Sequence, residues 1–361
     1  MAKLGEVCLL KAGKFVSAND ISPEYNKGLY PCFGGNGIRG YVADYTHDGE
    51  FPLIGRQGAL CGNVNLASGK FHATEHAVVV QPKIEMNVHW LYYAINAMNL
   101  GQYATGAAQP GLAVSKLETL SIEIPNISEQ NKIAQTLCKV EQLVNFRKQQ
   151  LAKLDELVKA QFVEMFGDIN VNNKKWMTYP LGELCTIVRG GSPRPIERYL
   201  GGTIPWIKIG DATTGENIYL NSTKEYIIQE GVKKSRMIKA GSLIFANCGV
   251  SLGFARIITF DGCIHDGWLA MEDIDEKLDK IFLLYSLNQM TEYFRKTAPA
   301  GTQPNLNTNI MKMHRQIVPP MEMQKAFISF VKCADRQKQI VQQSLDKLEL
   351  MKKALMQEYF G

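Results

Sequence analysis

The chain contains one long segment twice. Residues 109–167 align without a gap with residues 303–361, which lie 194 positions later. Both copies open on Gln-Pro-x-Leu and keep a proline followed five residues later by a glutamine, Gln130 or Gln324. Both close on Glu-x-Phe-Gly, at Gly167 and Gly361. Because a repeat of this kind marks a structural unit, we expect two similar halves.

The halves also begin alike, at Leu4-Gly5-Glu6-Val7-Cys8 and at Leu181-Gly182-Glu183-Leu184-Cys185. These starts are only 177 positions apart, so the second copy holds 17 extra residues in its interior. Agreement at both ends with a divergent interior predicts one scaffold that carries two different recognition surfaces. Duplication followed by neutral drift is the alternative.

Composition narrows the class of protein. A chain of 361 residues predicts two or three domains. No stretch approaches the ~18 apolar residues of a membrane span, and the early apolar run at residues 7–10 is too short for a signal peptide. Eight cysteines without a Cys-x-x-Cys pair predict reduced thiols in a cytoplasmic protein. A net charge of +5 permits nucleic acid as a partner.

Short apolar runs between glycine and asparagine turns predict mixed globular regions, interrupted by helices near residues 88–100 and 280–295. The expected fold class is α+β, with two globular domains joined by two long antiparallel coiled-coil helices. The expected limits are 1–126 and 180–320 for the globular domains, 127–167 and 321–361 for the helices, and 168–179 for a linker.

Each long helix has an apolar seam with alternating spacings of four and three, interrupted at Arg147 or Lys338. Ser128 is the expected N-cap of the first helix and Gly167 its expected end. Since each seam must be buried, we expect the helices to pair with each other; packing of each helix on its own domain is the alternative. The expected interface residues are Ile133, Leu137, Val140, Val144, Leu151, Leu154, Val158, Phe327, Val331, Val341, Leu345 and Leu348.

The sequence contains no complete catalytic motif. Gly35-Asn-Gly37-Ile-Arg-Gly40 matches Gly-x-Gly-x-x-Gly, but the residues that follow predict a strand and a turn rather than a phosphate-binding helix. There is no P-loop, and no Asn/Asp-Pro-Pro-aromatic loop of an amino-methyltransferase. The histidines lack metal-ligand spacing. We therefore expect no catalytic residue, no metal and no cofactor on this chain.

What remains is a set of polar loops punctuated by glycine, at residues 53–62 and 70–76 in the first half and at 243–253 and 265–268 in the second. Glycine lets a backbone approach a ligand closely, and Arg, Gln, Asn and Asp are side chains that read base edges. Each residue taken alone is more often an ordinary loop residue. Repeated on two domains, the set favours sequence reading over catalysis.

The order of these motifs resembles the specificity subunit of Type I restriction–modification systems. The resemblance rests on residues 35–41, 54–59, 73–77 and 128–130 in the first half, and on 204–208, 265–268 and 301–306 in the second. It implies that each globular domain is a target recognition domain that reads half of a bipartite DNA site. It also implies that the helices set the spacing between half-sites and dock two methyltransferase subunits.

The resemblance further implies restriction and translocation subunits as partners, with S-adenosylmethionine, ATP and magnesium held on the partner chains. Because the two sets of loops differ, the DNA site should be asymmetric. The residues expected to contact DNA are Asn36, Arg39, Arg56, Gln57, Lys70, His72, Thr74, His76, Gln109, Arg189, Arg194, Lys208, Lys233, Lys234, Arg236, Asn247, Ser251, His265, Asp266, Gln303 and Asn305.

Three alternatives stay open. A self-sufficient adenine methyltransferase would bind S-adenosylmethionine on this chain alone. A coiled-coil adaptor without a DNA role would keep all its partner binding in the helices. A specificity subunit of a methylation-only or phage-defence complex would lack the nuclease partner, and the sequence does not separate that case from full restriction.

Overall fold

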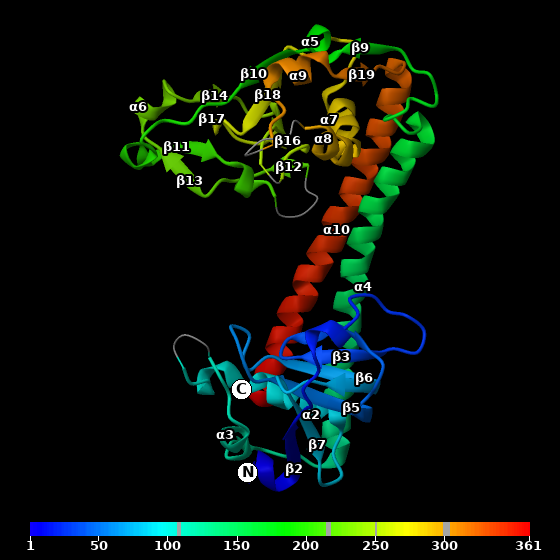
Figure 1. Cartoon of the computed structure of the whole chain (residues 1–361), viewed down its shortest axis with the longest axis vertical. Helices are drawn as coiled ribbons and strands as arrows, with labels where there is room; N and C mark the ends of the chain where they lie inside the picture. The colour runs from blue at the N-terminus through cyan, green and yellow to red at the C-terminus, as the bar shows by residue number, and fades with distance from the viewer. Residues whose placement is uncertain (107–109, 214–217, 250, 299–303) are drawn as a thin grey trace. The chain divides into compact units, whose positions relative to one another are not determined.

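The computed structural model describes the chain except for residues 107–109, 214–217, 250 and 299–303. It divides into two compact units (Figure 1). Unit 1 comprises Met1–Lys148 together with Gln343–Gly361, and unit 2 comprises Gln149–Gln342. The predicted α+β class with two long helices is confirmed: α4 runs over Ile127–Phe166 and α10 over Met321–Phe360.

Unit 1 is built on a six-stranded sheet with the order β2-β7-β5-β6-β3-β4. Helix α2, Val88–Ala97, packs against β5 and β6 (Figure 1). The sheet strands are β2 Cys8–Ala12, β3 Tyr30–Gly34, β4 Gly37–Val42, β5 His47–Gly55, β6 Val64–Ala73 and β7 Ala77–Pro82. The smaller elements are β1 Ala2–Lys3, α1 Leu4–Val7, η1 Ala18–Asp20, η2 Leu100–Tyr103, α3 Val114–Glu118 and β8 Ser121–Ile122.

Unit 2 divides its strands between two larger sheets, ordered β10-β18-β15-β16-β12 and β13-β11-β17-β14, with a separate pair β19-β9. Its strands are β9 Thr178–Pro180, β10 Thr186–Arg189, β11 Leu200–Ile207, β12 Tyr219–Leu220, β13 Glu225–Ile227, β14 Arg236–Ile238, β15 Leu243–Ala246, β16 Ala255–Ile258, β17 Gly262–Ile264, β18 Trp268–Glu272 and β19 Arg315–Ile317. Its short helices are α5 Leu181–Leu184, η3 Ile196–Arg198, η4 Ile209–Asp211, α6 Gln229–Val232, α7 Lys280–Gln289, α8 Thr291–Thr297 and α9 Thr308–Met313. The single helix predicted over 280–295 is therefore two helices, which meet at Met290.

Backbone pairing shows how the two copies correspond. In unit 1, β3 pairs in parallel with β6 at Phe33↔Ala73, and in unit 2, β11 pairs in parallel with β17 at Ile207↔Ile264. Gly62 N donates to Gly55 O, as Gly253 N donates to Ala246 O. The interval from Phe33 to Gly55 is 17 residues shorter than that from Ile207 to Ala246. The length difference between the copies therefore lies between β11 and β15.

Within each unit, α4 and α10 run antiparallel. In unit 1, Lys352 Nζ lies 2.7 Å from Glu141 Oε1 and Lys148 Nζ lies 3.0 Å from Glu349 Oε1, so residue numbers rise along one helix as they fall along the other. In unit 2, Lys338 is ion-paired with Asp155. Lys338, predicted only as an interruption of the seam, therefore makes a polar contact across the helix pair, where polar groups fix register.

The helix seams pack in both of the predicted ways, against the other long helix and against the domain of their own unit. Ile133 and Leu137 lie in the core of unit 1, packed with Trp90 and with the end of α10 at Tyr359 and Phe360. In unit 2, Val158, Phe327 and Val331 lie in the domain core. Val140, Val144, Val341 and Leu345 are also buried, whereas Leu151, Leu154 and Leu348 are only half-buried. The long helices thus pair and also complete the domain cores.

The ends of α4 test the predicted caps. Asn126 caps the helix, because its Oδ1 accepts from Glu129 N at 3.0 Å. Ser128 lies inside the first turn, so its prediction as N-cap was wrong. Gly167 ends the helix as predicted, with φ at +79° and its N–H donating to Val163 O at 2.8 Å.

The repeated glutamine has the same function in both units. Gln130 Oε1 accepts from Asn87 N at 2.9 Å, and Gln130 Nε2 donates to Pro125 O at 2.8 Å. Gln324 Oε1 accepts from Asp279 N at 2.8 Å, and its Nε2 donates to Pro319 O at 2.8 Å and to Lys277 O at 2.9 Å.

The residues that these glutamines hold, Asn87 and Asp279, are the N-caps of α2 and α7. Each buried glutamine therefore fixes a domain helix to the start of a long helix. We call Gln130 and Gln324 the clamp glutamines.

Candidate nucleic-acid interface

Three segments of unit 1 meet at the carboxyl end of strand β5. Arg56 N donates to His76 O at 3.0 Å, Leu112 N donates to Arg56 O at 2.9 Å, and Gly58 N donates to Pro110 O at 3.0 Å. We call residues 55–58, 74–77 and 110–112 the unit 1 junction. It joins the loop after β5, the turn between β6 and β7, and the repeated Pro-x-Leu motif.

Unit 2 repeats this frame at the end of β15. Asn247 N donates to Gly267 O at 3.0 Å, Leu306 N to Asn247 O at 2.7 Å, and Gly249 N to Pro304 O at 3.2 Å. We call residues 246–249, 265–268 and 304–306 the unit 2 junction. Arg56 and Asn247 thus occupy equivalent positions, and the repeated Pro-x-Leu motif is explained by its docking at both junctions. Gln109 and Gln303, which open that motif, lie outside the described residues.

The unit 1 junction carries polar groups that lack partners. The turn at Gly35 and Asn36 lies against it, since a Cβ on Gly55 would come within 1.9 Å of Gly35 O. Among the described residues, four buried polar atoms near the junction have no hydrogen-bond partner: Arg56 Nε, Thr74 Oγ1, Glu75 Oε2 and His76 Nδ1. Buried polar groups are normally paired, so this cluster requires partners from outside the protein chain, either water molecules or the groups of a ligand.

The unit 2 junction is more fully connected. Ser192 Oγ donates to Asp266 Oδ1 at 2.7 Å, and Arg189 Nε donates to Asp266 O at 3.0 Å. Gly267 N donates to His265 Nδ1 at 2.9 Å, so His265 Nε2 carries the ring proton and donates to Asp266 Oδ1 at 3.0 Å.

Charge at this junction is set by its neighbours. Burial disfavours ionisation of Asp266, but the hydrogen bond from Ser192 and the charges of Arg189 and Arg194 outweigh it and hold the pKa of that carboxyl below its usual range. Burial is also the main cause of a lowered pKa for His265, and nearby cations add to it against the opposing effect of Asp266. The junction therefore presents an ionised carboxylate beside a neutral imidazole at pH 7.

The basic side chains expected to meet phosphate differ in their surroundings. Arg39, Lys70, Arg194 and Lys233 are exposed. Lys70 lies over the Tyr45 ring at 4.7 Å, and Lys234 Nζ donates to Tyr199 OH at 2.6 Å. Arg236 is held by a bond from its Nε to Arg189 O at 3.0 Å. Lys208 is ion-paired with Glu225, so its charge is already compensated.

Burial corrects three of the predicted contacts. His72 is 8% exposed, with Nε2 3.2 Å from Lys14 O, and Thr74 and Asn247 expose no surface. In this conformation none of the three can reach a base edge, because a side chain facing the interior has no surface to offer. Asn247 Nδ2 instead donates to Asn305 Oδ1 at 3.2 Å and supports the junction from inside. Asn36, Gln57 and Asn305 keep exposed surface, as do His76, Ser251 and His265.

The structure adds polar residues that were not predicted. Glu75 lies in the unit 1 junction, and Ser192 holds Asp266 in the unit 2 junction. Asn63 Nδ2 donates to Asn36 Oδ1 at 2.6 Å and so fixes the turn beside the unit 1 junction. Glu75 could have been found from its place between Thr74 and His76, whereas no sequence signal joins Asn63 to Asn36 or Ser192 to Asp266.

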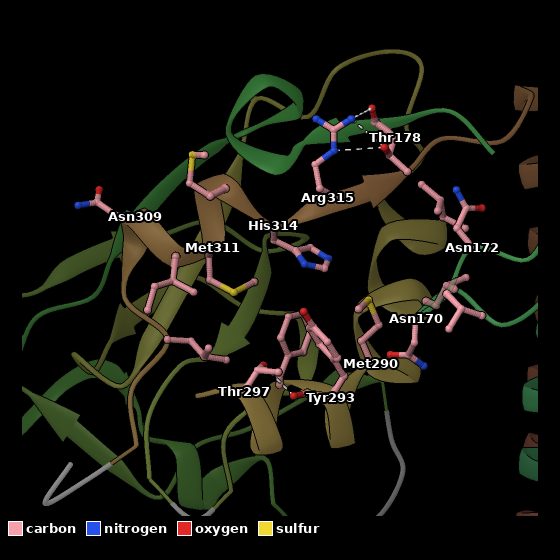
Figure 2. Close-up of a pocket in the computed structure, with 17 residues that line it drawn as sticks. Asn170, Asn172, Thr178, Met290, Tyr293, Thr297, Asn309, Met311, His314 and Arg315 are labelled. Carbon is pink, nitrogen blue, oxygen red and sulfur yellow. Dashed lines mark hydrogen bonds between the residues drawn. The ribbon is translucent and has the colours of Figure 1, made fainter. Parts of the chain in front are cut away.

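A separate cavity of about 710 Å³ lies in unit 2 (Figure 2). His314 points into it among Met290, Met311 and Tyr293, and burial lowers the pKa of His314 to about 4. Arg315 at its rim donates to Thr178 O at 2.7 Å. None of the predicted DNA contacts is among the described residues that line this cavity, so it is distinct from the junction.

Other kinds of site are not indicated. Residues 35–40 form the β3–β4 turn and most of β4, and a further strand follows, so no phosphate-binding helix begins there. No group of three or more His, Cys, Asp or Glu side chains in the described ranges is placed to hold a metal ion. Among the helices built from described residues, none is both long and apolar enough to cross a membrane.

Residues 1–156 and 173–350 both match the family model described as the Type I restriction modification DNA specificity domain. The chain belongs to this specificity-subunit family. Over 143 residues it is 52% identical to the Type I restriction enzyme EcoprrI specificity subunit of Escherichia coli, a match that covers 39% of this chain and 36% of that protein. It is 26% identical over 324 residues to a putative Type I specificity subunit of Haemophilus influenzae, covering 84% of this chain and 80% of the relative.

Solved structures from Type I restriction–modification systems share the fold. The S subunit from Mycoplasma genitalium aligns over 99% of this chain and 95% of its own length, with a TM-score of 0.61 at 18% identity. A structure from work on complex assembly of the Type I restriction–modification system aligns over 99% of this chain and 96% of its own length, with a TM-score of 0.60 at 15% identity. The resemblance read from the sequence is confirmed at the level of family and fold.

Proposed function

We propose that each unit reads one half of a bipartite DNA site through its junction. The supporting observation is that one backbone frame, repeated at Arg56 and Asn247, presents different side chains in the two units. Exposed Gln57 with Glu75 and His76 stands in one junction, and Cys248 with His265 and Asp266 stands in the other. Different side chains on a common frame favour an asymmetric rather than a palindromic site.

Phosphate contacts would supply affinity without sequence information. The exposed cations Arg39 and Lys70 in unit 1, and Arg194, Lys233 and Lys234 in unit 2, fit this role. Lys208 is the weaker candidate, because Glu225 already neutralises it. The binding constant of the assembled complex should therefore fall steeply with salt concentration.

We also propose that the antiparallel pair of α4 and α10 sets the spacing between the half-sites, about one helical turn of DNA, and docks two methyltransferase subunits. Restriction and translocation subunits would join the same complex. S-adenosylmethionine, ATP and magnesium would be bound by the partners, with no catalytic residue on this chain. A methylation-only or phage-defence complex remains the second candidate, since the proposed DNA reading is the same there.

The test is genome-wide mapping of N6-methyladenine in cells that express the chain with its neighbouring methyltransferase, against cells without the chain. A split, asymmetric motif that disappears with the chain is the expected result. Methylation that does not depend on the chain, despite an intact complex, would contradict the proposal. Cleavage of unmethylated DNA then separates full restriction from the methylation-only candidate.

A further inference from the structure

Equivalent positions of the two junctions hold a carboxylate. The frame that pairs Arg56 with Asn247 also pairs Glu75 with Asp266, each in the turn that leads into the next central strand, β7 or β18. This correspondence follows from hydrogen bonds and not from residue identity, because the turns read Thr74-Glu75-His76 and His265-Asp266-Gly267.

We propose that Glu75 and Asp266 each accept a hydrogen bond from the exocyclic amino group of a cytosine or adenine, and so fix which strand carries that base at one position of each half-site. The inference rests on the proposed function and names the chemistry that each junction selects. An ionised carboxylate has acceptors and no donor, and it is repelled by phosphate. In the major groove the amine donors are cytosine N4 and adenine N6, and Asp or Glu accepting from cytosine N4 is a recurrent pairing.

Asp266 is held in a way that suits this role. Its Oδ1 takes both internal donors, Ser192 Oγ at 2.7 Å and His265 Nε2 at 3.0 Å. No described residue donates to Oδ2. The side chain is 33% exposed, so Ser192 and His265 hold it through Oδ1 while part of it faces outward. A carboxylate positioned by its neighbours loses little rotamer freedom when it binds.

Glu75 is also held through one carboxylate oxygen, but by a different partner. Its Oε1 lies 3.2 Å from His76 Nε2, while its Oε2 is a buried atom without a hydrogen-bond partner among the described residues. The Glu75 side chain as a whole is 34% exposed, so part of it faces outward, as in Asp266.

A purely structural role for the two carboxylates would predict shared internal partners. The partners differ: Asp266 accepts a hydrogen bond from a serine in the segment after β10, whereas among the described residues the one polar side-chain partner of Glu75 is His76, the next residue along the chain. What the two positions share is an acceptor at the junction. Function therefore explains the repeated carboxylate better than turn geometry does.

The test uses the full chain with its methyltransferase and two near-isosteric substitutions, Asp266→Asn and Glu75→Gln. Asp261→Asn is the matched control, an exposed carboxylate of unit 2 that is bound to Lys239. Each junction variant should lose about tenfold or more of its discrimination at one base position of its own half-site, with the other half-site unchanged. The control should leave the whole motif unchanged.

A second measurement guards against misfolding. DNA in which the affected cytosine is replaced by pyrimidin-2-one, or the affected adenine by purine, lacks only the amine. The unsubstituted protein should bind this DNA about tenfold more weakly, and the matching junction variant should show no such difference. The inference is overturned if both variants keep the original preference at every position of a motif that still depends on the chain. A motif independent of the chain would instead refute the proposed function.

Discussion

The clamp glutamines carry a stability prediction that can be worked out from their contacts. Replacing Gln130 by alanine removes two hydrogen bonds, to Asn87 N and Pro125 O, and replacing Gln324 removes three. Each bond contributes about 1 kcal/mol, and backbone groups left buried without a partner add to the loss. We expect Gln130→Ala to cost about 2–4 kcal/mol in the stability of unit 1, and Gln324→Ala about 3–5 kcal/mol in that of unit 2.

Native-state hydrogen exchange of the full chain measures each effect locally. Protection of the Asn87 amide should fall in Gln130→Ala, and protection of the Asp279 amide should fall in Gln324→Ala. Gln135→Ala is the matched control, since Gln135 is an exposed glutamine on the same helix α4 as Gln130. A Gln130→Ala loss within about 0.5 kcal/mol of the control would refute the clamp argument.

Replacing Gln130 by glutamate tests the amide's hydrogen-bond donor separately from its acceptor. Gln130→Glu keeps an acceptor for Asn87 N but places a second acceptor opposite Pro125 O. The carboxyl should therefore have a raised pKa in the folded state, with a loss of stability at pH 7 that shrinks as the pH falls and the group is protonated. A loss of stability that does not change with pH would show that it does not arise from replacing the amide donor opposite Pro125 O.

Three further predictions concern single side chains. Burial lowers the pKa of His314 to about 4, so the folded state favours the neutral imidazole. Its contribution to stability is therefore complete above pH 6.5 and is lost as the pH falls toward 4. In urea unfolding, His314→Leu should remove about 3 kcal/mol of this acid dependence. Gly190→Ala places a Cβ 2.2 Å from His265 O and should cost about 1–3 kcal/mol; an unchanged urea midpoint would contradict the crowding. Lys352→Met removes a cation that, against burial, holds the pKa of Glu141 below its usual range. The resulting loss of about 1–2 kcal/mol at pH 7 should shrink below about pH 4.5, as thermal unfolding across pH would test.

The sequence predicts the repeat, the helix seams and the loops because each depends on spacing along the chain. The constant interval between Gln130 and Gln324 indicated an equivalent position, and the structure shows equivalent hydrogen bonds there. Periodicity likewise placed Leu137 and Val331 in buried positions. Patterns of this kind follow from local geometry, so they can be read before the fold is known.

Side-chain direction at the junction could not be read in the same way. Asn247 and Thr74 are polar residues next to strands, which is typical of surface positions, yet both face inward, one of them toward Asn305. The helix start was misplaced because Ser128 and Asn126 are both good cap residues two positions apart, and the structure shows Asn126 as the one that accepts from Glu129 N. The direction of Asn247 is set by a contact with Asn305, 58 residues further along the chain, which no local pattern predicts.

The order of synthesis has a consequence for how the two units fold. Unit 2 is a continuous stretch, Gln149–Gln342, whereas unit 1 needs Gln343–Gly361, whose Leu355, Tyr359 and Phe360 pack against its core. Domains usually close in the order in which they leave the ribosome. Unit 1 begins to emerge first, but its core needs the last turns of α10, so it should complete its fold after unit 2. A stop codon within those turns should therefore disrupt unit 1 and leave unit 2 folded.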